Sequence, residues 1–341
     1  MTTYSQAGVN LEAANDFVQG IKKIASPTNN SQVINGIGGF AGLFRIPKGY
    51  ENPVLVACTD GVGTKLKIAY ESGKLEGIGQ DLVAMCVNDL LCTGAKPLFF
   101  LDYLATGKLD STQALIIANS IAQACLESGS VLLGGETAEL PGMLPPKGYE
   151  LAGFSVGIVE ENKILNPDCT EEGDLLIGIP SSGVHSNGYS LIHSIIQKSN
   201  LDLQKTYSGF SRPLVDEFLE PTKIYTKTIQ PILDKVKAIA HITGGGLPEN
   251  LPRALNKSLK AKIKLNSWTI PQIFNFIQEQ GSVEESEMFK VFNMGIGLVL
   301  IVSPVEIQAV RNYLNEANQE FYELGYLEKK NNLDESSVDL V

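Results

Sequence analysis

The sequence has few cysteines and no long hydrophobic run, and these absences exclude several classes of protein. Its five cysteines are spread over 341 residues without a CxxC pair, so we expect neither a disulfide framework nor a zinc site of the usual spacing. The best apolar run, Met294–Val302, is far shorter than the roughly 18 residues that a membrane helix needs. The first residues, MTTYSQAGVN, have neither a charged region nor an apolar core, so no secretory signal is expected. We predict a cytoplasmic protein without a membrane partner.

Basic charge is also scarce. The chain has 27 basic and 38 acidic side chains, a net charge of −11, which argues against broad nucleic-acid binding. The remaining composition, 43% hydrophobic and 19% charged, is that of a globular protein, and the length suggests two domains. The polar run 162–173 contains Asn166-Pro167 and Gly173 as turn signals. We therefore predict domains at 1–165 and 166–341.

Hydrophobic periodicity predicts alternating helices and strands in both halves, which indicates an α+β fold with two α/β-type lobes. Helices are expected at 10–25, 81–93, 111–128, from about 187, and at 213–235, 271–280 and 304–318. Asn10 is the expected N-cap of the first helix. Strands are expected at 54–58, 97–104, 131–133, 151–159, 175–179, 236–242, 259–265, 295–302 and 321–328. The closing residues 329–341 suggest a solvated tail.

The two common phosphate-binding motifs, GxxxxGK[ST] and GxGxxG, are absent. In their place, the segment TDGVGTK follows the first predicted strand. Its glycines leave backbone N–H groups free to face an anion, and its lysine adds a positive charge; a plain Asp-Gly turn is the alternative. The glycine-rich stretch 36–42 is too flexible for an element interior, and we expect it to act as a lid over ATP.

Acidic residues occur inside or after strongly apolar segments of the first half. A buried carboxylate is costly unless it has a partner, so each one either caps backbone or holds a metal. Oxygen ligands without histidine fit Mg²⁺, which is usually shared with substrate phosphates. We predict the metal ligands Asp60, Asp89, Asp102 and Glu136. The predicted nucleotide-binding residues are Gly61, Gly63, Thr64, Lys65, Asn88, Asp102, Gly134, Gly135 and Glu136.

The second half offers glycine and hydroxyl turns without acidic ligands, which suit the phosphate monoester of a second substrate. They follow the predicted strands ending near Pro180 and His241. The predicted substrate-binding residues are Ser182, Gly183, His185, Ser186, Asn187, Thr243, Gly244, Gly245, Gly246 and Asn293. For His241, a functional role and a structural one are equally compatible with the sequence.

Several long motifs, in order, resemble the aminoimidazole ribonucleotide synthetase family, the phosphoribosylformylglycinamidine cyclo-ligases. They are TDGVGTKL, DLVAMCVNDLLCTGAKPLFFLDYLATGKL, GGETAELPGM, SSGVHSNGYSL, EPTKIY, HITGGGLPENLPR and EMFKVFNMGIG. The resemblance implies ATP-dependent closure of formylglycinamidine ribonucleotide to aminoimidazole ribonucleotide in purine biosynthesis, with ADP and phosphate as the other products. It also implies a homodimer in which the N-terminal lobes pair to form a barrel-like sheet.

The residues match this chemistry. ATP would convert the amide oxygen to an iminophosphate, and the amidine nitrogen would then displace phosphate. Such a transfer needs aligned charge more than a protein nucleophile. We predict the catalytic residues Asp60, Lys65, Asp89 and His185, with His185 moving a proton.

Related activities remain as alternatives. A thiamine-monophosphate kinase, selenophosphate synthetase or hydrogenase-maturation protein of the same superfamily is one group, and a non-catalytic nucleotide-binding regulator is another. A selenophosphate synthetase should carry a reactive cysteine near its start, whereas the first cysteine here is Cys58. A regulator should have lost some acidic residues, and all four are present.

Overall fold

The computed structural model describes residues 11–341, in which the chain forms two compact units. Unit 1 runs to Leu90 and includes Lys96–Glu161, whereas unit 2 contains Leu91–Ala95 and Asn162–Val341. No helix within 11–341 is long and apolar enough to cross a membrane. The predicted cap Asn10 lies outside the described residues.

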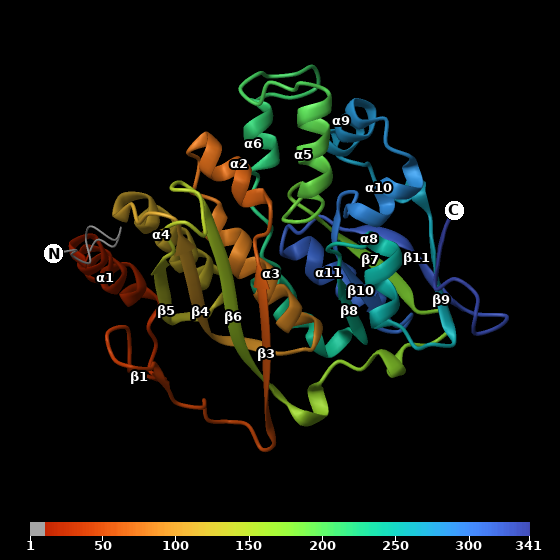
Figure 1. The fold of residues 1–341 in the computed structure, drawn as a ribbon. Helices are drawn as coiled ribbons and strands as arrows, with labels where there is room; N and C mark the ends of the chain where they lie inside the picture. Colours follow the sequence, from red (N-terminus) through yellow and green to blue (C-terminus); the bar gives the residue numbers. More distant parts are fainter. Residues whose placement is uncertain (1–10) are drawn as a thin grey trace. The chain divides into compact units, whose positions relative to one another are not determined.

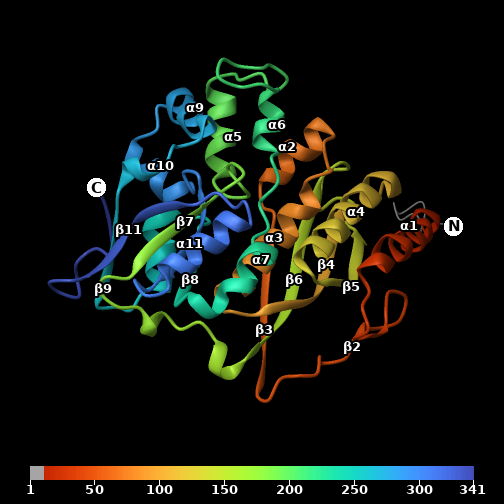
Figure 2. The same ribbon diagram turned by 180° about the vertical axis from the view of Figure 1, so that it is seen from behind.

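Unit 1 is built on a four-stranded sheet in the order β3-β6-β4-β5 (Figure 1). Figure 2 shows α3 and α4 over one of its faces. Helix α4 spans the predicted residues, because Asp110 accepts hydrogen bonds from the N–H groups of Thr112 and Gln113 and Gly129 ends it in the left-handed conformation. The elements are α1 Leu11–Ala25, η2 Ser26–Thr28, β1 Val33–Asn35, β2 Leu43–Phe44, β3 Pro53–Gly61, α2 Lys65–Ser72, α3 Ile78–Cys92, β4 Lys96–Thr106, α4 Ser111–Ser128, β5 Val131–Glu139 and β6 Tyr149–Glu160.

Two strands of unit 1 are longer than the sequence predicts. Strand β3 continues through Asp60 and Gly61, and β5 continues through Gly134 and Gly135. The placement of these residues in turns after the strands was therefore wrong. Glycine is unfavourable in the interior of a strand. Here the pairing of β3 with β6 and of β5 with β4 extends both strands through their glycines.

The second face of this sheet carries large exposed apolar side chains. Alternation along each strand brings Leu55, Tyr103 and Phe154 to this face. Their exposed fractions are 56%, 39% and 40%. The face is thus an apolar surface that the helices of unit 1 leave open.

Unit 2 contains a six-stranded sheet in the order β12-β9-β11-β7-β10-β8. Its strand β10 is buried at every residue and pairs with β7 and β8, and α7, η5 and α11 contribute to the core on one side. The elements are η3 Glu161–Lys163, η4 Pro167–Cys169, β7 Leu175–Pro180, α5 Tyr189–Lys198, α6 Leu214–Phe218, α7 Thr226–Ile229, η5 Gln230–Lys235, β8 Ala238–His241, α8 Gly246–Asn250, η6 Leu251–Ala254, β9 Leu259–Ile263, η7 Leu265–Ser267, α9 Gln272–Gly281, α10 Glu285–Val291, β10 Ile296–Val302, α11 Ile307–Glu316, β11 Tyr322–Lys329 and β12 Val338–Leu340.

Two predictions for unit 2 were wrong. The stretch 213–235 is not one helix but α6, α7 and η5, because Pro221 and Pro231 lack the N–H that a continuous helix requires. The closing residues are not a solvated tail: β12 pairs in parallel with β9 and forms the edge of the sheet. The ammonium of Lys260 fixes this end by contacting the carboxylates of Glu335 and Asp339.

Candidate functional site

Two of the predicted metal ligands lie in one row across the sheet of unit 1. Asp60 of β3 is opposite Gly153 of β6, which is opposite Asp102 of β4, which is opposite Gly135 of β5. Two strand spacings separate the backbones of Asp60 and Asp102 by about 10 Å. Because opposed residues project to the same face, both carboxylates belong to one face. Of the two opposed glycines, Gly135 leaves room beside Asp102, whereas Phe100 fills the space at Gly153.

Asp102 is the carboxylate of this row that has a buried oxygen without a hydrogen-bond partner among the described residues. Its side chain is 8% exposed, and its Oδ1 atom is buried without a hydrogen-bond partner within residues 11–341. A Cβ atom on Gly135 would lie 2.3 Å from this oxygen, so the glycine gives the carboxylate its space. Burial raises the pKa of Asp102 to about 7, although a hydrogen bond with its own backbone opposes part of the shift. Such an oxygen is suited to bind a cation.

The raised pKa of Asp102 predicts a pH-dependent stability. Unfolded Asp loses its proton near pH 4, whereas folded Asp102 keeps its proton up to about pH 7. Between these values the folded state binds more protons, so its stability falls as the pH rises, by up to about 4 kcal/mol. Asp102→Asn should remove this component, and the melting temperature of the ligand-free variant should therefore depend less on pH between 5 and 8 than that of the wild type. Equal pH dependence in the two proteins would contradict it.

The other acidic residues do not join Asp60 and Asp102 in a compact cluster. Glu136 follows Gly135 along β5 and therefore projects from the opposite face of that strand, while Asp89 lies on α3 beside the fully buried Asn88. Within the described part of the chain, no three His, Cys, Asp or Glu side chains gather closely enough to hold a metal ion. Asp102, Gly135 and Glu136 do line one cavity of about 540 Å³ together with α1. The metal site stays a prediction.

Lys65 does not reach into solvent. Its side chain and that of Asp81 are both fully buried, and its Nζ atom donates to Oδ1 of Asp81 at 2.8 Å. The lysine begins α2, directly after Gly63 with a φ of 70° and Thr64, and Asp81 lies in the first turn of α3. The pair therefore ties the TDGVGT segment to the helix that carries Asn88 and Asp89.

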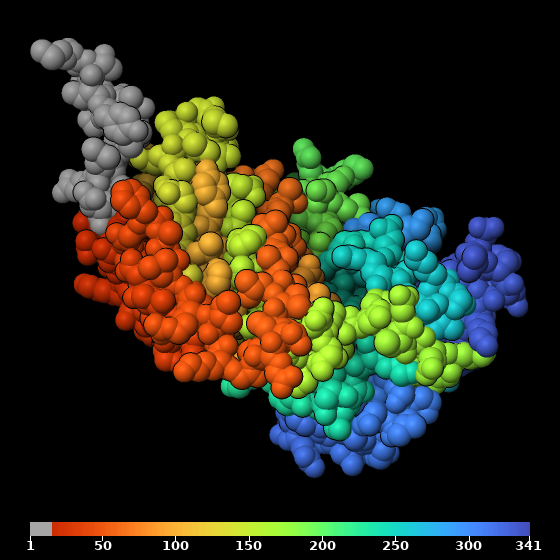
Figure 3. Space-filling model, turned by 90° about the horizontal axis from the view of Figure 1, so that it is seen from below, coloured from red at the N-terminus to blue at the C-terminus, as the bar shows by residue number. Residues whose placement is uncertain are grey.

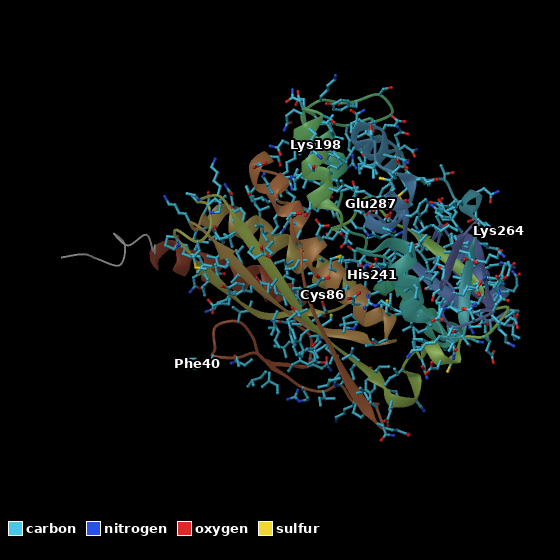
Figure 4. The ribbon with its side chains drawn as sticks, turned by 45° about the vertical axis from the view of Figure 1, so that its right-hand side comes forward. Phe40, Cys86, Lys198, His241, Lys264 and Glu287 are labelled. Atoms are coloured by element: carbon cyan, nitrogen blue, oxygen red, sulfur yellow. The ribbon has the colours of Figure 1, made fainter. Side chains whose placement is uncertain are left out.

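The glycine-rich stretch 36–42 covers a second cavity on the open face of the sheet. This cavity, of about 930 Å³, is lined by the loop, by Leu55 and Phe154, and by Asp102 and Glu136. The loop is fastened beyond its glycines, where Phe44 stacks on Phe99 with ring centroids 5.3 Å apart. Its Phe40 side chain is fully exposed and lies at the outer bend (Figure 4). Figure 3 shows the segment that carries the loop, in red, on the surface of unit 1.

In unit 2, the structure brings the predicted substrate-binding turns together. Strand β10 pairs with β7 and β8, so the ends of β7 and β8 meet at the beginning of β10. Asn293 donates to the carbonyl oxygens of Gly183 and Val184 and accepts from the Ser181 hydroxyl. A Cβ atom on Gly244 would lie 3.3 Å from Oδ1 of Asn187. The 181–188 turn, the 243–246 turn and Asn293 therefore form one site.

His185 lies inside its own turn. Its side chain is 1% exposed, its φ is 63°, and its Nε2 atom accepts a hydrogen bond from the backbone N–H of Ser182 at 3.1 Å. An accepting Nε2 leaves the proton of a neutral imidazole on Nδ1. The ring thus shapes the Ser182–Gly183 backbone, and its part in proton transfer stays a prediction. His241, at the end of β8 (Figure 4), is 5% exposed.

Sequence reasoning missed Asp81 and Asn250. Asp81 is sixteen residues from Lys65, so only the fold reveals the pair. Asn250 is 3% exposed, and its Nδ2 atom donates to the carbonyl oxygens of Thr243, Gly244 and Gly246. Its position four residues after Gly246, one helical turn away, was the available signal.

These features define a two-domain protein with carboxylates in the sheet of one unit and adjoining glycine-rich turns in the other. Family models match both parts: "AIR synthase related protein, N-terminal domain" over 38–159 and "AIR synthase related protein, C-terminal domain" over 171–336. Curated relatives named phosphoribosylformylglycinamidine cyclo-ligase include one from Thermoanaerobacter sp. strain X514, 51% identical over 94% of this chain and 96% of the relative. Another from Burkholderia cenocepacia is 48% identical over 95% and 92%. The chain belongs to the phosphoribosylformylglycinamidine cyclo-ligase family of enzymes, as its motifs predict.

Solved structures confirm the fold. A thiamine-monophosphate kinase from Stenotrophomonas maltophilia superimposes with a TM-score of 0.68 over 97% of this chain and 96% of its own, at 15% identity. The hydrogenase maturation protein HypE in complex with ATP gives 0.68 over 98% and 92%, at 13% identity. At such low identity these similarities show the fold alone. The sequence identity of both proteins to this chain is far below that of the cyclo-ligases.

Proposed function

We propose that the protein closes the ring of formylglycinamidine ribonucleotide to form aminoimidazole ribonucleotide, with ATP converted to ADP and phosphate through an iminophosphate, in purine biosynthesis in the cytoplasm. The observation that carries the proposal is the 51% identity to a cyclo-ligase over 94% of the chain. Domain 1–165 would bind ATP and Mg²⁺ and form the dimer. Domain 166–341 would bind the ribonucleotide.

The residues present fit a magnesium ion. The buried Oδ1 atom of Asp102 lacks a hydrogen-bond partner in the described chain, and the acidic donors are all oxygens, as Mg²⁺ prefers. Asp60, Asp89 and Asp102 would hold the ion together with phosphate oxygens of ATP, which explains why the carboxylates alone form no closed cluster. Glu136, which projects from the opposite face of β5, shares only a cavity with Asp102. When bound, Mg²⁺ neutralises the charge of the transferring phosphoryl group.

The protein's own groups would orient the reactants. Backbone N–H groups of Gly63 and Thr64 would face the triphosphate, whereas the Gly61 N–H donates to Oδ1 of Asp60. Lys65 holds this segment through Asp81, and Asn88 lies beside Asp89. In unit 2, Ser182, Ser186 and Asn187 contact the ribonucleotide, and His185 fixes the 182–183 backbone and supports proton transfer during ring closure. Close alignment of the amide and the γ-phosphate supplies most of the rate.

A coupled assay tests the proposal. The purified full-length protein should release ADP and the aminoimidazole product in equal amounts when given ATP, Mg²⁺ and formylglycinamidine ribonucleotide. Omission of the ribonucleotide should abolish both. Phosphorylation of thiamine monophosphate instead would favour the kinase alternative, and nucleotide binding without any turnover would favour a regulator.

The loop 36–42 should close over the nucleotide. Its fully exposed Phe40 would then become buried, and backbone amides of 34–44 would exchange hydrogen more slowly when a nonhydrolysable ATP analogue and Mg²⁺ are added. Hydrogen-exchange mass spectrometry provides the measurement, and peptides from β9, in unit 2, serve as an internal control. Equal exchange with and without nucleotide would contradict the lid.

The open face of the unit 1 sheet supports a homodimer. Leu55, Phe154 and Tyr103 expose between 39% and 56% of their surface there, which is unusual unless a partner covers them. Pairing two such faces would give the barrel-like sheet. Sedimentation should therefore detect a species with twice the mass of the chain, and Leu55→Glu together with Phe154→Glu should shift it to the monomer. A wild-type monomer at micromolar concentration would contradict the dimer.

A further inference from the structure

Two of the five cysteines meet in unit 1. Cys58 lies on β3, an edge strand of the sheet, and Cys86 lies on α3 (Figure 4). The Cys58 thiol donates to the carbonyl oxygen of Cys86 at 3.1 Å. A hydrogen bond between the two thiols, together with burial, raises the pKa of Cys86. The two sulfur atoms are therefore neighbours, although 28 positions separate them in the chain, and both are free thiols.

The two thiols differ in their access to solvent. Cys58 is partly exposed, whereas the side chain of Cys86 is fully buried. An oxidant in solution therefore reaches Cys58 first, and the product of that reaction forms beside the Cys86 sulfur. An accessible thiol next to a second, resolving thiol is the arrangement of redox-sensitive cysteine pairs. The close approach also gives the second thiol a high effective concentration.

This thiol pair lies against the carboxylates that we expect to bind Mg–ATP. Cys58 and Asp60 are two residues apart on β3 and project from the same face of the strand. The sulfur of Cys86 accepts a hydrogen bond from the backbone N–H of Asp60. Along α3, Cys86 precedes Asp89 by three residues, so both lie on one side of the helix. A disulfide bond of about 2.05 Å is shorter than any contact between two thiols, so it would draw β3 and α3 together at Asp60.

We propose that Cys58 and Cys86 are a modification site, at which a low-molecular-weight disulfide such as oxidised glutathione forms a reversible Cys58–Cys86 bond that lowers turnover. The Cys58 sulfur gives its proton to water and attacks one sulfur of the oxidant, and one glutathione leaves. The Cys86 sulfur then loses its proton, attacks the Cys58 sulfur and displaces the second glutathione. The cysteines give up two electrons and two protons, and the oxidant becomes two thiols.

Only the effect on turnover rests on the proposed function, because the bond itself needs no substrate. A single reversible bond of this kind is compatible with a reducing compartment, where disulfides are transient and report the redox state. Its effect would come from displacement of Asp60 and Asp89, since neither cysteine is one of the groups expected to contact the nucleotide.

Incubation of the reduced, full-length protein with oxidised glutathione tests the proposal. Alkylation and peptide mass spectrometry should show the loss of two of the five free thiols and one cross-linked pair of peptides that contains Cys58 and Cys86. Turnover should fall by about 10- to 100-fold, the scale of a displacement of about 1 Å in an active site. Dithiothreitol should restore both the thiols and the turnover.

Two variants serve as controls. Cys58→Ser should form no cross-link and should keep its turnover in oxidised glutathione, and Cys58→Ala should behave in the same way if the serine variant folds poorly. Cys169→Ser, which removes an exposed thiol of unit 2, should respond to the oxidant as the wild type does.

The outcomes separate this site from the proposed reaction. Absence of the Cys58–Cys86 cross-link in the wild type would overturn the proposal, and so would an equal loss of turnover in Cys58→Ser. A complete cross-link with unchanged turnover would overturn the coupling to the site. If the reduced wild type closes no ring, the proposed reaction fails instead. The binding of Mg–ATP to the reduced and oxidised proteins, measured by calorimetry, then decides the coupling: equal affinities would overturn it, and weaker binding by the oxidised protein would support it.

Discussion

Asp60→Asn and Asp89→Asn should each lower turnover at least about 100-fold, the scale of losing one preorganised charge contact at the reacting group. Each substitution keeps the size of the side chain and removes one predicted ligand of Mg–ATP. The fold should survive, because asparagine keeps the volume of the side chain and, at position 60, keeps an oxygen that can accept from the Gly61 N–H. Turnover and melting temperature of the ligand-free variants are the measurements.

The matched control is Asp16→Asn, which removes an exposed carboxylate of the same unit and should leave turnover unchanged. Raising the Mg²⁺ concentration should restore part of the activity of the two site variants if the carboxylates bind the ion. Unchanged turnover with a lowered melting temperature would mean that Asp60 and Asp89 have structural roles only.

Lys65→Met should destabilise the protein by about 3–5 kcal/mol, because it leaves the fully buried Asp81 without the ammonium that neutralises it. For a unit of this size, that loss corresponds to a melting temperature lower by about 10 °C. Lys67→Met is the control: Lys67 is half exposed and lies 3.9 Å from Glu71, and such a surface pair contributes less than about 1 kcal/mol. Equal losses in the two variants would contradict the assignment.

The double variant Lys65→Met/Asp81→Leu separates structure from catalysis. Replacement of a buried ion pair by apolar groups of similar volume is often neutral or stabilising, so the double variant should recover most of the melting temperature. If Lys65 acts only by holding the TDGVGT segment, turnover should recover with stability. A stable double variant without turnover would show that the ammonium itself contacts the nucleotide.

Many of the predicted site residues were found because they are polar side chains in strongly apolar segments. A lone aspartate in PLFFLDYLATG and an Asn-Asp pair in an apolar helix are expensive unless they bind something, and this cost is visible without a fold. The helix 111–128 could also be predicted from the sequence, because its N-cap Asp110 and its C-terminal Gly129 form hydrogen bonds only with residues close to them in the chain. Long motifs identified the family, which the relatives confirm.

By itself, then, the sequence determined the family, the alternation of helices and strands, and the acidic and glycine-rich segments in which chemistry is expected, because these depend on composition and near neighbours. Only the tertiary structure decided which of those residues meet. The strand register places Asp60 and Asp102 in one row and Glu136 on the opposite face. Burial pairs Lys65 with Asp81, and residues 338–340 pair with β9 at the edge of the second sheet. Each depends on pairing between segments far apart in the chain, and the free energy of that pairing is absent from any local window of the sequence.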